Sequence, residues 1–330
     1  MSRLRFAMIG CGAVATGHQL PALAQSSRVD LVALVDRDEA WLAKVARRFD
    51  VPEAYTSHRA LIGRVDAALV ATPNTTHVEI ACDLLEHGVH VLCEKPIATT
   101  RADMERMLDA AARGGARVMA AHCTRFSPNV AMLHDLLALG WFGSLVEVSA
   151  GLGGDYGMSE HRTNFRRERG LAGGGVLVDL GIHLIDVALW LCGAAPTAVG
   201  YSAAVAPGWE VETDAEVVLD FSDGSRAALA SSYTHGLDNT LVVRGSEGWA
   251  RLHLHSSTEL TLFTPRARAC NRAGMQRLLV PEESRYLRQV DHFCEAITSG
   301  DDFLVGADEV LAGIDVIERC YAGDGAHDGR

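Results

Sequence analysis

The stretch that decides the fold of the first part of the chain is residues 4–15, LRFAMIGCGAVA. An apolar run of strand length ends at Gly10, where the pattern G-x-G-x-x-A begins. Gly10 permits a tight turn, Gly12 lets a phosphate approach the backbone, and the following helix offers its free N–H groups to negative charge. The residues predicted to bind the pyrophosphate of a dinucleotide are therefore Gly10, Gly12, Ala13 and Val14.

Apolar runs of strand length alternate with helical patterns as far as residue 122. The further runs lie at residues 29–35, 66–72, 89–93 and 116–122. Such alternation predicts a parallel sheet with helices on both faces. Together with the glycine pattern, it indicates an α/β dinucleotide-binding domain of the Rossmann type over residues 1–122.

The pattern changes after residue 122. Alternating strands follow one another between residues 198 and 264, with hairpin turns at 222–225 and 245–248. Two helices are expected near the end of the chain, at 284–298 and 306–321. Residues 123–330 are therefore predicted to form an α+β domain with a mostly antiparallel open sheet, which binds substrate and mediates oligomerisation.

One face of the predicted second sheet is apolar. The residues expected on this face are Val217, Leu219, Leu229 and Val243. If helices do not cover the face, it should pair with another subunit, so a homodimer or a homotetramer is predicted.

Composition narrows the classes of partner. The 330 residues carry a formal net charge of −12, which argues against nucleic acid and against an acidic membrane surface. No apolar stretch is expected to span a bilayer, and the start of the chain is interpreted as a strand rather than a leader, so a cytoplasmic protein is predicted. The eight cysteines show no C-x-x-C spacing, which favours buried thiols and no metal site.

The choice between NAD and NADP depends on two adjacent residues. Asp36 ends the second strand, where its carboxylate can accept hydrogen bonds from the adenosine ribose and repel a 2′-phosphate. Arg37 would attract that phosphate, or it is simply a solvated helix residue. NAD is the favoured cofactor, and NADP is the alternative.

The ends of the third and fourth strands supply further candidates. Thr72, Pro73, Asn74 and His77 follow the third strand, where loops line the ligand crevice of such folds. Asn74 contacts the cofactor or caps the next helix. Glu94 and Lys95 follow the fourth strand. Only Lys44 and Lys95 are lysines among 30 basic residues, which draws attention to Lys95.

At this point the sequence resembles the glucose–fructose oxidoreductase and inositol dehydrogenase (Gfo/Idh/MocA) family. The resemblance is carried by GCGAVATGH, VDRD, ATPNTTH, CEKPIA and AGGGVLVDLGIHLIDVALWLCG. It implies that Lys95, Asp179 and His183 are catalytic and that the Lys95–Pro96 bond is cis. The residues themselves agree, since Asp179 and His183 are four apart and share one helical face. The glycine run 173–175 predicts a flexible approach to that helix.

The resemblance also suggests where cofactor and substrate bind. Arg125 occupies a position near the nicotinamide in this family, although an ion pair between domains explains it equally well. The loop around residues 155–169 is interpreted as a substrate loop. Its candidate polyol contacts are Tyr156, His161, Asn164 and Arg166.

The function implied is reversible oxidation of a secondary alcohol on a sugar, amino sugar or cyclitol. His183 takes the hydroxyl proton, Lys95 stabilises the developing negative charge, and Asp179 orients the substrate or the imidazole. Lys95 and His183 could exchange these roles. Two alternatives stay open: an NAD-dependent glycoside hydrolase that oxidises its substrate transiently, and a non-catalytic NAD(P)-binding sensor of the same fold.

Overall fold

The computed structural model of the chain describes residues 3–154, 165–256, 258–266 and 274–323. The chain folds into two compact units. The first unit comprises Met1–Cys123 and Tyr286–Leu311, and the second comprises Thr124–Arg285 and Ala312–Arg330.

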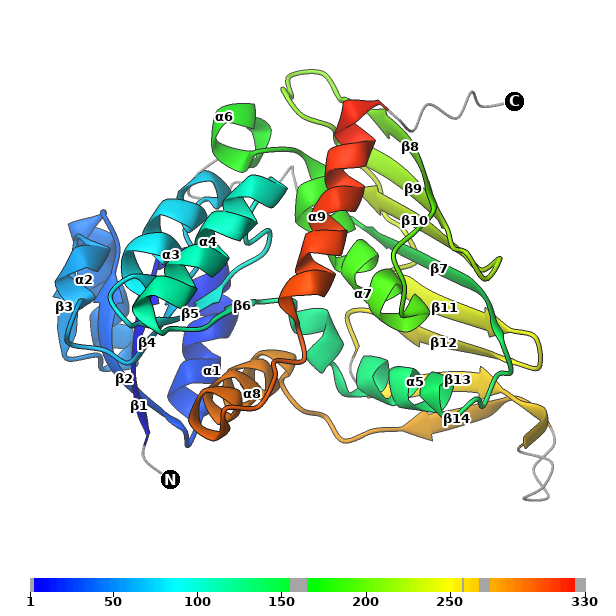
Figure 1. Cartoon of the computed structure of the whole chain (residues 1–330), viewed down its shortest axis with the longest axis horizontal. Helices are drawn as coiled ribbons and strands as arrows, with labels where there is room; N and C mark the ends of the chain where they lie inside the picture. The colour runs from blue at the N-terminus through cyan, green and yellow to red at the C-terminus, as the bar shows by residue number, and fades with distance from the viewer. Residues whose placement is uncertain (1–2, 155–164, 257, 267–273, 324–330) are drawn as a thin grey trace. The chain divides into compact units, whose positions relative to one another are not determined.

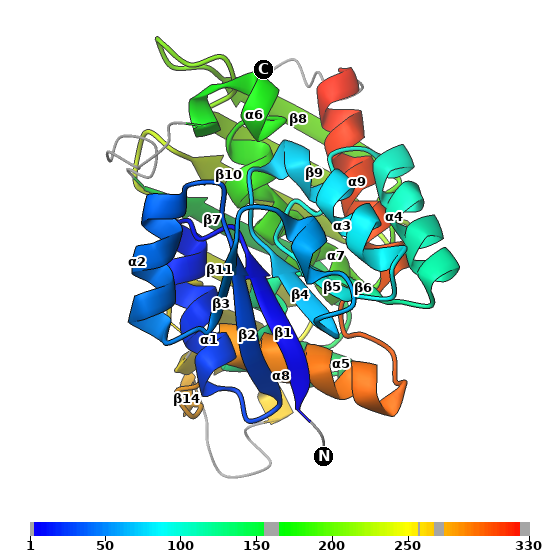
Figure 2. The ribbon, with the colours of Figure 1, turned by 90° about the vertical axis from the view of Figure 1, so that its left-hand side faces the viewer.

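The first unit contains a six-stranded sheet in the order β3-β2-β1-β4-β5-β6, in which every neighbouring pair is parallel. The strands are β1 (Leu4–Ile9), β2 (Val29–Val35), β3 (Glu53–Tyr55), β4 (Ala67–Val70), β5 (His90–Cys93) and β6 (Val118–Ala120). The helices are α1 (Leu20–Gln25), α2 (Glu39–Phe49), α3 (His77–Leu85), α4 (Arg101–Gly114) and α8 (Arg285–Ser299). In Figure 2, α1 and α2 lie to one side of the strands and α3 and α4 to the other. The predicted Rossmann sheet is confirmed.

This sheet positions the candidate residues of the first unit along one edge. Strands β1, β4 and β5 are neighbours and run in the same direction, so their carboxyl ends lie side by side. Gly10, Thr72 and Glu94 are within two residues of those three ends. Ligands of open parallel sheets bind at this edge.

Helix α8 packs on the first sheet. The domain boundary predicted from the sequence had placed all residues after 122 in the second domain. The rings of Phe6 and Phe293 meet edge to face at 6.0 Å. Ser26 Oγ donates to Asp291 Oδ1 at 2.5 Å. An apolar helix face at the end of the chain does not reveal which sheet it will cover, so the sequence could not assign α8.

The second unit contains an eight-stranded sheet in the order β14-β13-β12-β11-β7-β10-β9-β8. The strands are β7 (Leu145–Gly153), β8 (Ala198–Ala204), β9 (Asp214–Asp220), β10 (Arg226–Ser232), β11 (Thr240–Gly245), β12 (Trp249–His253), β13 (Glu259–Phe263) and β14 (Gln276–Leu279). The pairing is antiparallel except between β7 and β10, which confirms the mostly antiparallel sheet. The helices are α5 (Pro128–Ala138), α6 (Arg169–Ala172), α7 (Ile182–Cys192) and most of α9 (Ala307–Ala322), and in Figure 1 α5, α7 and α9 lie on one side of the sheet.

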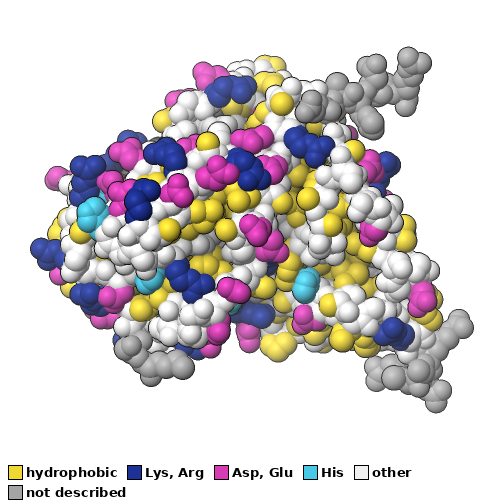
Figure 3. Space-filling view, in the orientation of Figure 1, with side chains coloured by type: hydrophobic (Ala, Val, Ile, Leu, Met, Phe, Trp, Pro, Cys, Tyr) yellow, Lys and Arg dark blue, Asp and Glu magenta, His cyan; other side chains and the backbone are white. Residues whose placement is uncertain are grey.

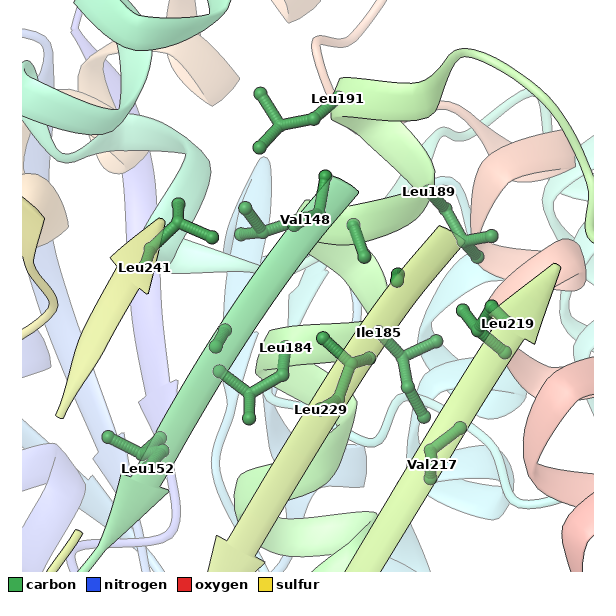
Figure 4. Close-up of a cluster of buried hydrophobic side chains, with 14 of the residues drawn as sticks. Val148, Leu152, Leu184, Ile185, Leu189, Leu191, Val217, Leu219, Leu229 and Leu241 are labelled. Carbon is green, nitrogen blue, oxygen red and sulfur yellow. The ribbon is translucent and has the colours of Figure 1, made fainter. Parts of the chain in front are cut away.

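Helix α7 covers the apolar face from which self-association was predicted. Val217, Leu219, Leu229 and Val243 are at most 5% exposed. Figure 4 shows Leu184 and Ile185 of α7 packed against residues of this face in one hydrophobic cluster. This face therefore belongs to the core of the unit. The homodimer or homotetramer stays a prediction, and it would need another surface.

One segment of this core also has the composition of a membrane span. The run Arg169–Cys192 is long and apolar enough to cross a bilayer, which corrects the expectation that no stretch is. However, 72% of its most apolar window is buried inside the structure, as is typical of the core helix of a soluble protein.

On the face drawn in Figure 3, acidic and basic side chains are interspersed and do not form a patch of one sign.

Candidate active site

The glycine turn after β1 has the geometry that a dinucleotide requires. Gly10 has φ +87°, and a Cβ there would overlap the carbonyl oxygen of Ala71, so only glycine fits. A Cβ at Gly12 would instead point into open space, which leaves room for a phosphate to approach the backbone. The chain then forms a π-helical turn, Ala15–Gln19, before α1. The turn therefore fits the pyrophosphate of a dinucleotide.

Asp36 is fixed beside this turn. Its Oδ2 accepts from Cys11 N at 2.8 Å, and its Oδ1 accepts from Asp38 N at 3.0 Å. Trp41 Nε1 donates to the Cys11 carbonyl at 2.6 Å, which ties α2 to the same turn. The half-buried carboxylate is thus held against the glycine turn, whereas Arg37 is exposed.

The residues after β4 form a tight turn in which His77 has a structural role. Asn74 begins a 3₁₀ turn, Asn74–Thr76, and does not cap α3, whose N-cap is Thr76. His77 is fully buried, with Nδ1 2.9 Å from the Pro96 carbonyl and Nε2 2.8 Å from the Thr72 carbonyl. Burial lowers the pKa of His77. Both ring nitrogens face the backbone, so His77 supports the loops after β4 and β5 instead of contacting a cofactor.

Lys95 lies on the loop after β5, and its neighbour Glu94 is held in place. Gln19 Nε2 donates to Glu94 Oε1 at 2.6 Å, and Lys95 N donates to Glu94 Oε2 at 3.2 Å. Glu94 is buried and Lys95 is half-buried. The Lys95–Pro96 bond is cis, as expected. Since Gln19 belongs to the turn that follows the glycines, one hydrogen bond joins the dinucleotide turn to the lysine loop.

Asp179 is held by two donors in the second unit. Arg166 Nε and Tyr233 Oη each donate to Asp179 Oδ2 at 2.7 Å. Burial raises the pKa of Tyr233 well above its usual value, so its hydroxyl stays protonated and donates. Trp209 stacks on Tyr233 with ring centroids 5.5 Å apart. The carboxylate is thus held in one direction.

His183 begins the second turn of the helix that carries Asp179. Asp179 lies in a π-helical turn, Leu177–Gly181, which runs directly into α7. Such turns occur often at functional sites. The Thr124 hydroxyl lies 3.5 Å from His183 Nδ1. This contact is made by Nδ1 of the imidazole.

Arg125 is occupied by a buried ion pair. Its side chain is fully buried, and its Nη2 donates to Asp186 Oδ1 at 2.8 Å. Its Nε also donates to the same carboxylate, 3.0 Å from Oδ2. The guanidinium lies over the Trp190 ring at 5.3 Å. Both residues of this ion pair belong to the second unit, so the pair holds Arg125 against α7.

Some sequence-based candidates fall elsewhere. Tyr156, His161 and Asn164 lie outside the described residues. In the part of the chain that the structure describes, no group of three or more His, Cys, Asp or Glu side chains could hold a metal ion. Sequence reasoning missed Tyr233 as a partner of Asp179, because the two are 54 positions apart and only the fold brings them together.

Comparison with known proteins places this geometry in context. Residues 4–122 match the family described as "Oxidoreductase family, NAD-binding Rossmann fold", and residues 130–251 match the "GFO/IDH/MocA C-terminal domain". The rhizopine catabolism protein MocA of Rhizobium meliloti is 31% identical over 235 residues, which is 70% of this chain and 71% of that protein. D-xylose 1-dehydrogenase (NADP(+)) 2 of Haloferax volcanii is 25% identical over 320 residues, or 96% of each chain.

A solved structure agrees over nearly the full length. Aldose-aldose oxidoreductase from Caulobacter crescentus, complexed with glycerol, superposes with a TM-score of 0.88 at 28% identity, covering 98% of this chain and 97% of that one. The protein is thus an NAD(P)-dependent oxidoreductase with a Rossmann domain and a second, mostly antiparallel domain. Within that class, the chain belongs to the Gfo/Idh/MocA family.

Proposed function

We propose that the protein interconverts a secondary alcohol and a ketone on a sugar, amino sugar or cyclitol. The observation that carries this proposal is the position of Lys95. It follows β5 on the same sheet edge as the glycine turn after β1, and Gln19 joins the two through Glu94. An ammonium at that edge suits a hydroxyl oxygen that becomes negative as its proton leaves.

The roles of the residues follow from their surroundings. His183 takes the proton of the substrate hydroxyl as general base, since the ordinary pKa of histidine lies near neutral pH. Lys95 donates a hydrogen bond to the same oxygen. Asp179, held by Arg166 and Tyr233, accepts hydrogen bonds from substrate hydroxyls or orients the imidazole. A bound nicotinamide supplies the hydride acceptor in one direction and the donor in the other.

NAD is the proposed cofactor in preference to NADP. Both oxygens of Asp36 accept backbone N–H groups, so the carboxylate cannot swing away from a ribose without losing two hydrogen bonds. A fixed negative charge at this position repels a 2′-phosphate. The exposed Arg37 is the residue that would permit some use of NADP.

A polyhydroxylated substrate is supported by the site and by the relatives. Asp179 and Arg166 offer charged acceptor and donor groups, which suit several hydroxyls on one small molecule. Two of the named relatives are a D-xylose dehydrogenase and an aldose-aldose oxidoreductase, and the second is complexed with glycerol. We also propose that the protein is cytoplasmic and that it forms a homodimer or a homotetramer. Analytical ultracentrifugation of the purified protein would test the oligomeric state.

The test is a cofactor-reduction screen over sugars and cyclitols, run with NAD and NADP in parallel. At least one polyol should reduce the nicotinamide cofactor, and the rate should be higher with NAD than with NADP. Lys95→Ala should lower turnover about a hundredfold or more, while Lys44→Ala on α2 should not change it. Near-normal turnover in Lys95→Ala would refute the assignment. Release of a sugar from a glycoside without net NADH would favour the hydrolase instead.

A further inference from the structure

The start of the helix that carries Asp179 and His183 is bound by a single residue. Glu212 Oε1 accepts from Gly175 N at 2.9 Å and from Leu177 N at 3.2 Å, and the Glu212 carbonyl accepts from Val176 N at 2.8 Å. Three consecutive backbone N–H groups therefore donate to Glu212. These are the donors that a helix leaves without partners at its N-terminus, where a negative charge is also favourable.

The glycine run before this helix is explained by close packing rather than by flexibility. A Cβ at Gly175 would overlap the carbonyl oxygen of Glu212. A Cβ at Gly174 would overlap the hydroxyl of Tyr321. Both glycines are buried. Their lack of a side chain is what allows Glu212 and Tyr321 to reach the backbone at the helix start.

Tyr321 supplies a further donor to the same carboxylate oxygen. Its hydroxyl lies 2.7 Å from Glu212 Oε1 and comes from the last turn of α9. Burial raises the pKa of Tyr321, and the neighbouring Glu212 carboxylate adds to the rise. The hydroxyl therefore stays protonated and donates to Glu212. Tyr201 packs edge to face on the Tyr321 ring at 6.3 Å.

The contact with Glu212 continues to Asp179 through one residue. Gly175 donates its N–H to Glu212, and its carbonyl accepts from Asp179 N at 3.2 Å. His183 follows one turn later. A shift of Glu212 would move Gly175, and with it the backbone from which both side chains project.

We propose that Glu212 and Tyr321, together called the Glu212 cap, are positioning residues for the oxidoreductase reaction. They set the place of Asp179 and His183 by fixing residues 175–177, and neither touches the reacting atoms. This inference rests on the proposed function of Asp179 and His183. Under this proposal, Tyr321 in the last turn of α9 affects the turnover rate as well as the packing of the unit.

The experiment compares Tyr321→Phe with Tyr201→Phe. Each removes one hydroxyl from the same pair of packed rings, but only Tyr321 donates to Glu212. We expect kcat on the best polyol of the screen to fall about tenfold in Tyr321→Phe and about a hundredfold in Glu212→Gln, since small misplacement of reacting groups is costly. The KM for NAD should stay within about twofold, and Tyr201→Phe should keep the wild-type kcat.

Two readouts separate positioning from stability. The pH profile of kcat/KM should shift in Tyr321→Phe, because the surroundings of His183 change, whereas a merely structural role would lower only the melting temperature. An unchanged kcat and pH profile in both Tyr321→Phe and Glu212→Gln would overturn the proposal. If the wild-type protein reduces no cofactor, the proposed function fails by itself. Hydrogen exchange at the amides of residues 175–183 then tests the cap: faster exchange in Tyr321→Phe than in Tyr201→Phe supports it, and equal exchange refutes it.

Discussion

The hydroxyl of Tyr233 donates to Asp179 Oδ2 at 2.7 Å, joining the end of β10 to the π-helical turn that precedes α7. Arg166 Nε binds the same oxygen. A carboxylate that receives two such donors is held in a single direction. The partners of Asp179 thus suit it to orienting a substrate rather than to moving a proton.

Replacement of Tyr233 by Phe keeps the buried ring and removes only this hydroxyl. A hydrogen bond to a charged group contributes about 1.5–3 kcal/mol, so kcat/KM for the polyol should fall about tenfold or more. The KM for NAD should not change, because the dinucleotide turn lies in the other unit. Steady-state kinetics with the cofactor at saturation measures this. A wild-type kcat/KM would show that Asp179 does not depend on Tyr233.

Asp36 should control the choice between NAD and NADP. Asp36→Ser removes the charge that repels a 2′-phosphate, so the ratio of kcat/KM for NADP to that for NAD should rise about tenfold, or about 1.4 kcal/mol. Arg37→Ala is the matched change on the adjacent residue, and it should lower the use of NADP only. Parallel kinetics with both cofactors gives the ratio. If Asp36→Ser leaves it unchanged, the 2′-position of the cofactor does not approach Asp36.

The buried pair of Arg125 and Asp186 should matter more to stability than to cofactor binding. Removal of one partner leaves an uncompensated buried charge, so Arg125→Met should lower the free energy of unfolding by about 3–5 kcal/mol. The double variant Arg125→Met, Asp186→Leu should recover much of this loss. Urea denaturation of the two variants and the wild-type protein measures both changes. Equal loss in the single and double variants would contradict the pair as the cause.

The pH dependence of stability should reflect His77. Its pKa is lowered by burial from the ordinary value of 6.5, so below that pH the unfolded chain binds the proton and the folded chain does not. Stability is therefore lost as the pH falls through 6.5 toward the lowered pKa, with a slope of up to about 1.4 kcal/mol per pH unit from this group. Burial also lowers the pKa of His90 and His292, which adds in the same direction.

His77→Gln should flatten this part of the stability profile, while His87→Gln, at an exposed position, should leave it unchanged. Denaturation midpoints between about pH 7 and pH 5 give the comparison. A profile equally steep in the two variants would mean that His77 takes up its proton without opening of the loops that it supports.

The sequence predicted those features that lie close together along the chain. The glycine turn, the acid at the end of β2 and the lysine after β5 are each local signals, because a strand and the loop after it are continuous in sequence. The Asp179–His183 pair was expected from the family resemblance, and its spacing of four residues agreed with one helical face. The extra width of the π-helical turn at Leu177–Gly181 has no such local signature.

What the sequence could not predict are the partners brought in by the fold. Tyr233 and Glu212 reach the helix of Asp179 only through strand pairing and packing, from 54 and 37 positions away. His77 and Arg125 have residue types that suit ligand binding, and only their burial and their partners show the supporting role. A polar residue near a site thus reveals its function through what its atoms contact, which a pattern of letters does not contain.

We propose that Lys95 and His183 act on the same hydroxyl of the substrate. The most direct measurement is a crystal structure of the protein with NAD and a polyol that the screen identifies. We predict that Lys95 Nζ and His183 Nε2 both lie within about 3.2 Å of one hydroxyl oxygen, on the carbon that faces the nicotinamide ring. A bound polyol whose oxygen nearest the nicotinamide contacts neither side chain would contradict the account.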